Sequence, residues 1–134
     1  MIRPISVAEA LPVRQSVLWP GHPLDHARVP GDEAARHFGW FDGGGLIAVG
    51  SLFQDGPSVQ LRKFAVLPEA QGQGIGTALL THMVAECRGS GAGLLWCDSR
   101  LDAMGFYARL GFTSSGSAFE KRGRPYHRMQ LQLC

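Results

Sequence analysis

The chain has 134 residues, enough for one domain of ordinary size with a core of its own, and we expect a single domain over 1–134. Thirteen Lys and Arg against eleven Asp and Glu give a formal net charge of +2, far from the basic excess of a nucleic-acid-binding surface. No stretch approaches about 18 uninterrupted apolar residues, and the N-terminal segment has no leader-like apolar core. Composition therefore argues against nucleic acid and membrane as partners and favours a cytoplasmic protein.

The first half of the chain predicts four strands and one helix. A short strand over 2–7 precedes a helix over 8–19, and Pro12 leaves the start of that helix open because proline has no amide donor. The next stretch, 20–34, holds three prolines and two glycines, which indicates a loop or at most broken helical turns. Glycine turns then separate three further strands of an antiparallel meander, over 35–42, 45–53 and 58–67.

A helix with a broad apolar face follows the meander. It begins near residue 75 and ends near the glycines at 89–91. The apolar face repeats every three or four residues and consists of Ile75, Leu79, Leu80, Met83, Val84 and Cys87. A continuous apolar run over 93–98 then predicts a strand buried on both faces.

The last part of the chain predicts one short helix and two strands. Ala103, Phe106 and Leu110 share a helical stripe, and the glycine that follows them is a stop signal. The two strands lie over 111–116 and 126–133, which leaves a basic cluster in a solvated loop between them: Lys121, Arg122 and Arg124. The elements thus alternate as in a mixed α/β sheet.

The three cysteines predict neither a disulfide nor a metal site. Cys87, Cys97 and Cys134 are odd in number, include no C-x-x-C pair and have no histidine at zinc-ligand spacing. We expect all three to be reduced, with the first two in the core. We also expect no metal.

A glycine-rich loop, QGQGIGT over 71–77, lies between a strand and a helix and resembles a phosphate-binding loop. A P-loop would need Lys and Ser or Thr directly after its last glycine, but Gly76 is followed by Thr77 and Ala78. The dinucleotide fingerprint G-x-G-x-x-G would need a third glycine where Thr77 stands. What remains is a loop of bare backbone amides at the positive end of a helix, which suits a pyrophosphate.

Two motifs at a fixed separation identify a family. Gln71, Gly74 and Gly76 form Q-x-x-G-x-G after the strand residues FAV, and FYARLGF follows about thirty residues later. In this arrangement the chain resembles the GCN5-related N-acetyltransferases (GNAT). The resemblance covers roughly 45–134 well and the first forty residues poorly.

The resemblance implies a mixed, mostly antiparallel α/β sheet flanked by helices, with its fourth and fifth strands splayed apart, and a site for acetyl-CoA. The backbone of Phe64, Ala65 and Val66 would bind the pantetheine arm. The pyrophosphate would lie on the loop amides of Gln71, Gly72, Gln73, Gly74, Ile75, Gly76 and Thr77.

The resemblance also places Tyr107 near the sulfur of CoA. A phenol with a pKa of about 10 is protonated at neutral pH and can donate a proton or a hydrogen bond to the departing thiolate. The sequence departs from the family pattern at Arg100, where an asparagine is common. The side-chain contacts to the pantetheine arm are therefore left open by the resemblance.

The implied reaction is direct attack by a primary amine of a small molecule on the thioester, with Tyr107 as general acid and an amide near Val66 facing the carbonyl oxygen. The proton acceptor for the ammonium is left open among Glu69, Glu120, His127 and water. Arg62 and His127 are predicted substrate contacts, which would suit an acidic amine or amino acid.

Two other functions stay open on the sequence alone. A non-catalytic acyl-CoA-binding or sensing domain would keep the loop and lose the chemistry. A dinucleotide-binding module would bind NAD more tightly than CoA. The oligomeric state is also open, a homodimer included.

Overall fold

A computed structural model describes residues 1–133. The strands are β1 (Ile2–Ile5), β2 (Arg36–Asp42), β3 (Gly45–Asp55), β4 (Ser58–Val66), β5 (Leu94–Arg100), β6 (Thr113–Lys121) and β7 (Arg124–Gln132). The helices are α1 (Val7–Leu18), α2 (Ile75–Gly89) and α3 (Met104–Arg109). This order of strands and helices is the predicted one.

The chain divides into two compact units. The first comprises Met1–Phe53 with Leu61–Met83, and the second comprises Gln54–Gln60 with the chain from Val84 onward. Strands β1 and β2, nearly all of β3 and Leu61–Val66 of β4 belong to the first unit, whereas Ser58–Gln60 of β4 belongs to the second with β5, β7 and β6. The single domain over 1–134 stays a prediction.

Helix α1 opens on a capping box rather than at Pro12. Ser6 Oγ accepts a hydrogen bond from the Glu9 amide at 3.1 Å, and the Glu9 carboxylate accepts one from the Ser6 amide at 2.9 Å. These two bonds satisfy amides that a helix start leaves without partners. Pro12 lies inside the helix on its exposed side, so the doubt that it cast on the start was misplaced.

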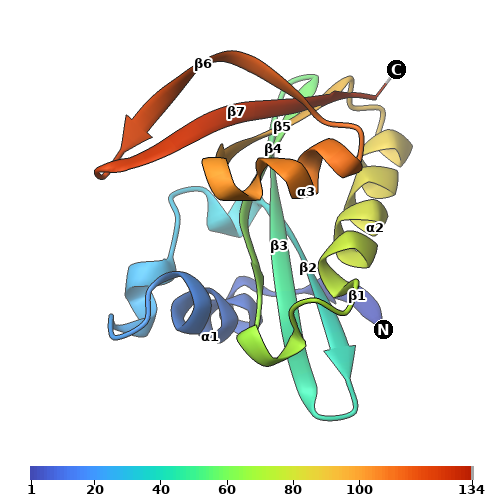
Figure 1. Ribbon diagram of the computed structural model, residues 1–134. Helices are drawn as coiled ribbons and strands as arrows, with labels where there is room; N and C mark the ends of the chain where they lie inside the picture. The colour runs from blue at the N-terminus through green and yellow to red at the C-terminus, as the bar shows by residue number, and fades with distance from the viewer. Residues whose placement is uncertain (134) are drawn as a thin grey trace. The chain divides into compact units, whose positions relative to one another are not determined.

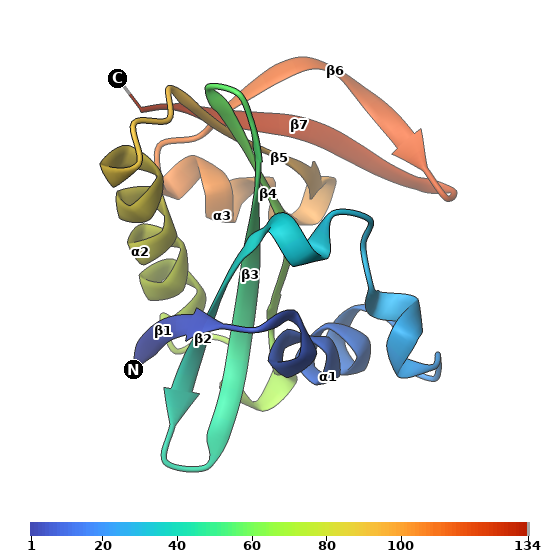
Figure 2. The same cartoon turned by 180° about the vertical axis from the view of Figure 1, so that it is seen from behind.

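In the first unit β2 and β3 pair antiparallel, as predicted for the first two strands of the meander, and β1 pairs antiparallel with the other edge of β2. In Figures 1 and 2, β1, β2 and β3 lie side by side, and Ile5 is registered with His37 and Phe38 with Gly50. A Cβ at Gly50 would lie 2.8 Å from Met83 Sδ and 2.9 Å from the Phe64 ring. Glycine here therefore lets α2 and the end of β4 pack closely on β3.

The predicted apolar face of α2 is confirmed. Leu79, Leu80, Met83 and Cys87 are fully buried, and Ile75 and Val84 are at most 9% exposed. Burial of each such side chain contributes about 1.5–3 kcal/mol, so this face fixes the helix and with it the loop that precedes its first turn.

Strands β4 to β7 form the sheet of the second unit. Ser58–Gln60 of β4 runs parallel to Leu94–Trp96 of β5, and β5, β7 and β6 pair antiparallel in that order. The prediction that the apolar run over 93–98 would be buried on both faces is wrong. Leu95, Cys97 and Ser99 are buried, whereas Trp96 and Asp98 on the other face are only half-buried.

The final hairpin is longer than predicted. Lys121 and Arg124 are strand residues paired with each other, so they do not lie in a wide loop. Only Arg122 and Gly123 form the turn, and both have left-handed backbones, with φ of 54° and 77°. Such two-residue turns match the twist of a hairpin, although asparagine is the usual residue at the first position.

Three further features of residues 1–133 bear on function. No helix there is long and apolar enough to cross a membrane. Within the same residues, no three or more His, Cys, Asp or Glu side chains lie close enough together to hold a metal ion. Cys87 and Cys97 are buried thiols outside any disulfide, as expected, and Cys134 lies outside the described residues.

Candidate functional site

The glycine-rich loop connects the end of β4 with the start of α2, as its sequence predicted. After a 3₁₀ turn over Pro68–Ala70, the Gln71 side chain donates from Nε2 to the carbonyl oxygen of Val66 at 3.0 Å. Gln73 donates from Nε2 to the Glu69 carbonyl at 3.3 Å. Both glutamine side chains therefore hold the loop to its own ends, and neither blocks the backbone between them.

Two of the three loop glycines are required by backbone geometry. Gly72 and Gly74 have φ of 77° and 80°, a left-handed region that side chains rarely adopt. A Cβ at either position would meet no protein atom within 4 Å, so open space lies above the loop. Gly76 lies within the first turn of α2, where the leading amides of a helix have no carbonyl one turn earlier to bond. This geometry suits an anion at the helix start.

The strand residues predicted for the pantetheine arm lie directly before this loop. Ala65 is buried in the core of the first unit, while Phe64 and Val66 are half-buried. Beside them, Lys63 has a left-handed backbone with φ of 54°, which is costly for a residue with a side chain. The regular alternation of side chains along β4 is therefore interrupted just before Phe64.

Arg62 and Lys63 both lie over aromatic rings of the first unit. The Arg62 guanidinium is 5.5 Å from the centroid of Phe53, and Lys63 Nζ is 5.6 Å from the centroid of Trp19. Each cation therefore already has a favourable electrostatic contact within the protein, which competes with binding of an anionic ligand. Arg62 as a substrate contact stays a prediction.

Tyr107 lies in an aromatic cluster of the second unit. Its ring makes edge contacts with Phe106 at 5.1 Å and with Phe112 at 5.5 Å between centroids. Its carbonyl accepts the amides of Leu110 and Phe112, which closes the end of α3 on β6. In both ribbon views α3 lies along β7, which it contacts. The ring is thus held by packing and by its own backbone.

The hydroxyl of Tyr107 lies beside the thiol of Cys97 on β5, with the phenol oriented to donate toward the sulfur. Burial first, and then this contact, raises the pKa of Tyr107 above its ordinary value. Burial, followed by the charge of Asp98, raises the pKa of the Cys97 thiol to about 12. Both groups are therefore protonated at neutral pH, and Tyr107 keeps a proton to donate.

The three candidates for the base lie apart in the chain, and the structure leaves them as predictions. Glu69 is exposed in the first unit, and Glu120 is exposed on β6 of the second. His127 is half-buried on β7, where its Nδ1 lies 3.1 Å from the Arg128 carbonyl oxygen. The cofactor residues all belong to the first unit and Tyr107 to the second.

Sequence reasoning missed a buried polar network in the first unit. Arg14 of α1 donates two hydrogen bonds to the Asp32 carboxylate, at 2.8 and 2.9 Å, and a third to Ser51 Oγ at 2.9 Å. Ser51 Oγ lies 2.7 Å from His37 Nδ1, and His37 Nε2 lies 2.8 Å from the Asp32 carbonyl. All four side chains are less than 10% exposed.

The network has one consistent direction. The Asp32 carbonyl can only accept, so His37 Nε2 donates to it, and the Ser51 hydroxyl, which accepts a hydrogen bond from Arg14, donates to His37 Nδ1. Burial opposes the charge of Asp32, but the hydrogen bonds from Arg14 and from the Val29 amide outweigh it and lower the pKa of that carboxyl. Arg14 thus bonds the carboxylate of Asp32 and His37 bonds its carbonyl, and together they fix the segment that follows α1.

One signal in the sequence could have revealed Arg14. Ala10 and Leu11, one helical turn before it, are buried, and so is the adjacent Val13, so Arg14 interrupts the apolar stripe of α1. A charged residue in such a stripe needs a buried partner. The partner itself, 18 residues away, has no comparable signal.

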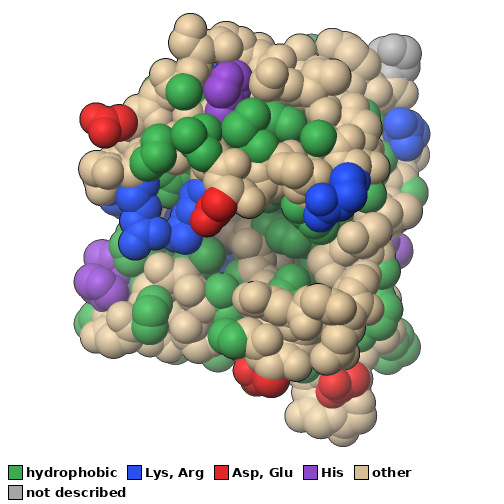
Figure 3. Space-filling view, in the orientation of Figure 1, with side chains coloured by type: hydrophobic (Ala, Val, Ile, Leu, Met, Phe, Trp, Pro, Cys, Tyr) green, Lys and Arg blue, Asp and Glu red, His purple; other side chains and the backbone are tan. Residues whose placement is uncertain are grey.

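Charges on the surface gather locally even though the net charge is small. On the face shown in Figure 3, Lys and Arg side chains form small separate groups, and carboxylates lie singly among them. Any recognition of charge by this face therefore depends on local groups of side chains and not on the net charge.

Comparison with known proteins places this geometry in a family. The model of the acetyltransferase (GNAT) family matches residues 6–112. A Bacillus subtilis (strain 168) protein, the uncharacterized N-acetyltransferase YitI, is 28% identical over 135 residues, or 94% of this chain and 91% of the relative.

Solved structures share the fold at low identity. The ribosomal-protein-S18-alanine N-acetyltransferase from Escherichia coli has a TM-score of 0.80 at 22% identity, with 99% of this chain and 93% of that chain covered. An aminoglycoside 6'-N-acetyltransferase complexed with coenzyme A has a TM-score of 0.82 at 14% identity, covering 100% and 97%. These matches confirm the predicted fold class.

Proposed function

Because the chain belongs to the acetyltransferase (GNAT) family, as the match over residues 6–112 establishes, we propose that it transfers an acetyl group from acetyl-CoA to the primary amine of a small molecule in the cytoplasm. The observation that carries the proposal is the strand, loop and helix junction. Two left-handed glycines there leave open space over bare amides at the start of α2. Such a loop suits the pyrophosphate of CoA.

In the proposed reaction, the amine nitrogen forms a bond to the carbonyl carbon of the thioester, and the bond from that carbon to sulfur breaks. The amide of Val66, directly before the loop, is the expected donor to the carbonyl oxygen. The electron pair of the broken bond leaves with the CoA sulfur. No covalent bond between acetyl group and protein is required.

Tyr107 supports the departing sulfur as a general acid. A thiolate of ordinary pKa, about 8.5, is a weaker base than a phenolate of pKa about 10 or above. Full proton transfer from Tyr107 is therefore uphill, and a short hydrogen bond from its hydroxyl supplies most of the stabilisation. The raised pKa of Tyr107 keeps that donor protonated throughout the working pH range.

The acceptor amine has to lose a proton before it attacks, and the candidate bases are Glu69, Glu120, His127 and water. We propose an acidic amine or amino acid as the acceptor, with Arg62 and His127 as its first candidate contacts. Both residues are half-buried, so each presents part of its side chain to solvent.

The proposal is tested by replacing Tyr107 with phenylalanine. The change keeps the aromatic packing and deletes the hydroxyl, so folding and CoA affinity should stay close to wild type. Turnover in a thiol-release assay should fall by roughly 10- to 10⁴-fold if sulfur departure limits the rate. Equal turnover in both proteins would return Tyr107 to a packing role.

A further inference from the structure

A group of cations surrounds Tyr126 on one face of the sheet in the second unit. Tyr126 on β7 is registered with Arg100 on β5 and with Phe119 on β6. Arg124 and Arg128 lie two residues before and after Tyr126, so alternation places them on the same face. Lys121 is registered with Arg124 and joins them. We call these four cations with Tyr126 the cationic face.

Among the residues that the structure describes, only one of the four cations is neutralised by an ion pair. Arg128 donates to the Asp98 carboxylate, at 2.9 and 3.4 Å, and its guanidinium lies 4.0 Å from the Trp96 ring centroid. The charge of Asp98 is thereby compensated by Arg128 and does not neutralise the other three cations. Glu120, the nearest carboxylate along β6, is registered with Pro125 and so projects from the opposite face.

The remaining cations are costly to the fold as they stand. Lys121 lies directly opposite Arg124, and like charges at directly opposed positions destabilise a sheet. Lys121 Nζ recovers part of this cost over the Tyr126 ring, 5.4 Å from its centroid. An anion between the cations would remove the repulsion.

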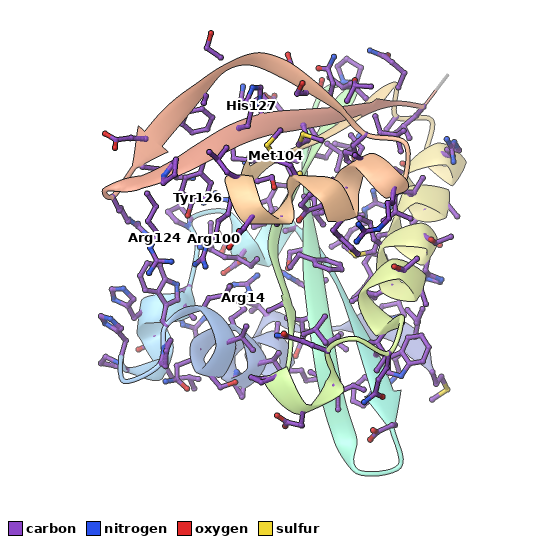
Figure 4. The ribbon with its side chains drawn as sticks, in the orientation of Figure 1. Arg14, Arg100, Met104, Arg124, Tyr126 and His127 are labelled. Carbon is purple, nitrogen blue, oxygen red and sulfur yellow. The ribbon has the colours of Figure 1, made fainter. Side chains whose placement is uncertain are left out.

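Figure 4 shows how the labelled members of the face lie. Arg100, Arg124 and Tyr126 are found together on one side of β7, while His127 lies on its other side. This agrees with the register, in which His127 is paired with Ser99 and Tyr126 with Arg100. His127 therefore does not share the face on which the arginines gather.

We propose that the cationic face binds an anionic group of the acceptor, a carboxylate or a phosphate, and that Arg100 and Arg124 determine this specificity. The inference rests on the proposed function and names the residues that would recognise the acidic group of its acceptor. Two exposed guanidiniums offer paired donors that match the oxygens of either group, and Tyr126 gives them an aromatic floor.

The position of Arg100 connects this face with the chemistry. Arg100 ends β5, and the chain runs directly from it through Leu101–Ala103 into α3, which carries Tyr107. The hydroxyl of Tyr107 lies beside Cys97, three residues earlier on the same strand, where the side chain projects from the face opposite to that of Arg100.

The test compares matched acceptors that differ only in charge. The pairs are an amino acid with its amide and phosphoethanolamine with ethanolamine, assayed with acetyl-CoA by thiol release. Wild type should favour the anionic member of at least one pair by about tenfold or more in kcat/KM. The pair that shows the preference tells whether a carboxylate or a phosphate is recognised.

Replacement of both arginines, Arg100→Gln with Arg124→Gln, should reduce this preference to about twofold or less, mainly by raising KM for the acid. Arg124→Lys keeps the charge without the paired donors and should give an intermediate value. Arg124→Glu should favour a cationic amine. Arg88→Gln, an exposed arginine at the end of α2, is the control and should leave the preference unchanged.

An equal rate for acid and amide in active wild type, or the same loss for both in the variants, would overturn the proposal while leaving the acetyltransferase function intact. If wild type acetylates no amine, phosphate binding measured by calorimetry decides. Binding that is lost in the double variant but kept in Arg88→Gln would support the cationic face and contradict the proposed function. No phosphate binding in such an inactive protein would overturn both.

Discussion

The contact between Tyr107 and Cys97 determines where the hydroxyl proton of Tyr107 points. The phenol donates toward the Cys97 sulfur, so its proton has to turn from Cys97 to a departing sulfur, which the rotatable hydroxyl allows. Cys97 in this role positions Tyr107 and takes no acetyl group itself, because a thiol with a pKa of about 12 is a poor nucleophile at neutral pH.

We therefore expect Cys97 to resist alkylation in the folded protein. At pH 8 its thiolate fraction is about 10³-fold below that of an ordinary thiol, so iodoacetamide should modify it correspondingly slowly. Mapping by mass spectrometry, before and after unfolding in urea, gives both rates. Labelling of native Cys97 at the rate of a free thiol would show that the site is open and the thiol ionised.

The same shift has a consequence for stability. The folded-state pKa of Cys97 is raised, so the unfolded chain loses its thiol proton first as the pH rises. The stabilising contribution is complete below the ordinary thiol pKa, about 8.5, and is lost as the pH rises toward 12.

Asp32 and Asp25 offer a matched comparison of a buried and an exposed ion pair. Asp32→Asn leaves the buried Arg14 guanidinium without its counter-charge and should lower the free energy of unfolding by about 3–5 kcal/mol. Asp25→Asn removes an exposed pair with Arg28, whose loss should cost about 1 kcal/mol or less. Urea unfolding of both variants measures the two changes.

Equal effects of the two substitutions would contradict the stabilising role of the buried network. The pH dependence provides a second readout. Because the folded-state pKa of Asp32 is lowered, its contribution is present above its unfolded value of about 4 and is lost as the pH falls through the folded value. Wild type should therefore lose more stability in acid than Asp32→Asn does.

At the scale of elements, the junction of β4, the loop and α2 carries the binding prediction. Gly74→Val places a branched side chain at φ of 80° and in the open space above the loop. We expect a loss of stability of about 1–2 kcal/mol and a fall in CoA affinity of about tenfold or more.

Gly21→Val is the control for backbone strain. Gly21 has φ of 83°, lies in the same unit, and a Cβ added to it would also meet no protein atom within 4 Å. The stability of the Gly21→Val protein should fall by a similar amount, while its affinity for CoA, measured by calorimetry, stays unchanged. Unchanged affinity in folded Gly74→Val would remove the loop from the binding site.

Elements with a strong apolar periodicity could be predicted from the sequence. Element ends that depend on the backbone conformation or capping of one or two residues could not. The apolar face of α2 gave both its position and its buried side. The start of α1 was obscured by Pro12, since the capping box of Ser6 and Glu9 outweighs one missing donor. The length of the β6–β7 hairpin was missed because Arg122 is an unusual residue for a left-handed turn position.

At the scale of the whole molecule, family membership was accessible because the Q-x-x-G-x-G loop and FYARLGF occur at a fixed separation. The polar networks were not, because they join residues distant in sequence. Arg14 meets Ser51 across 37 positions, and Asp98 meets Arg128 across 30. Such pairs depend on strand register and helix placement, which single-residue preferences leave undetermined.

The central claim is direct transfer of an acetyl group from acetyl-CoA to an amine. It is tested by incubating the protein with acetyl-CoA and a mixture of small primary amines, and analysing small molecules and protein by mass spectrometry. We expect an acetylated amine and free CoA in equal amounts, and unmodified protein when acetyl-CoA is supplied alone. Acetyl-CoA that binds the protein but stays intact with every amine would contradict the claim and would indicate an acyl-CoA-sensing domain.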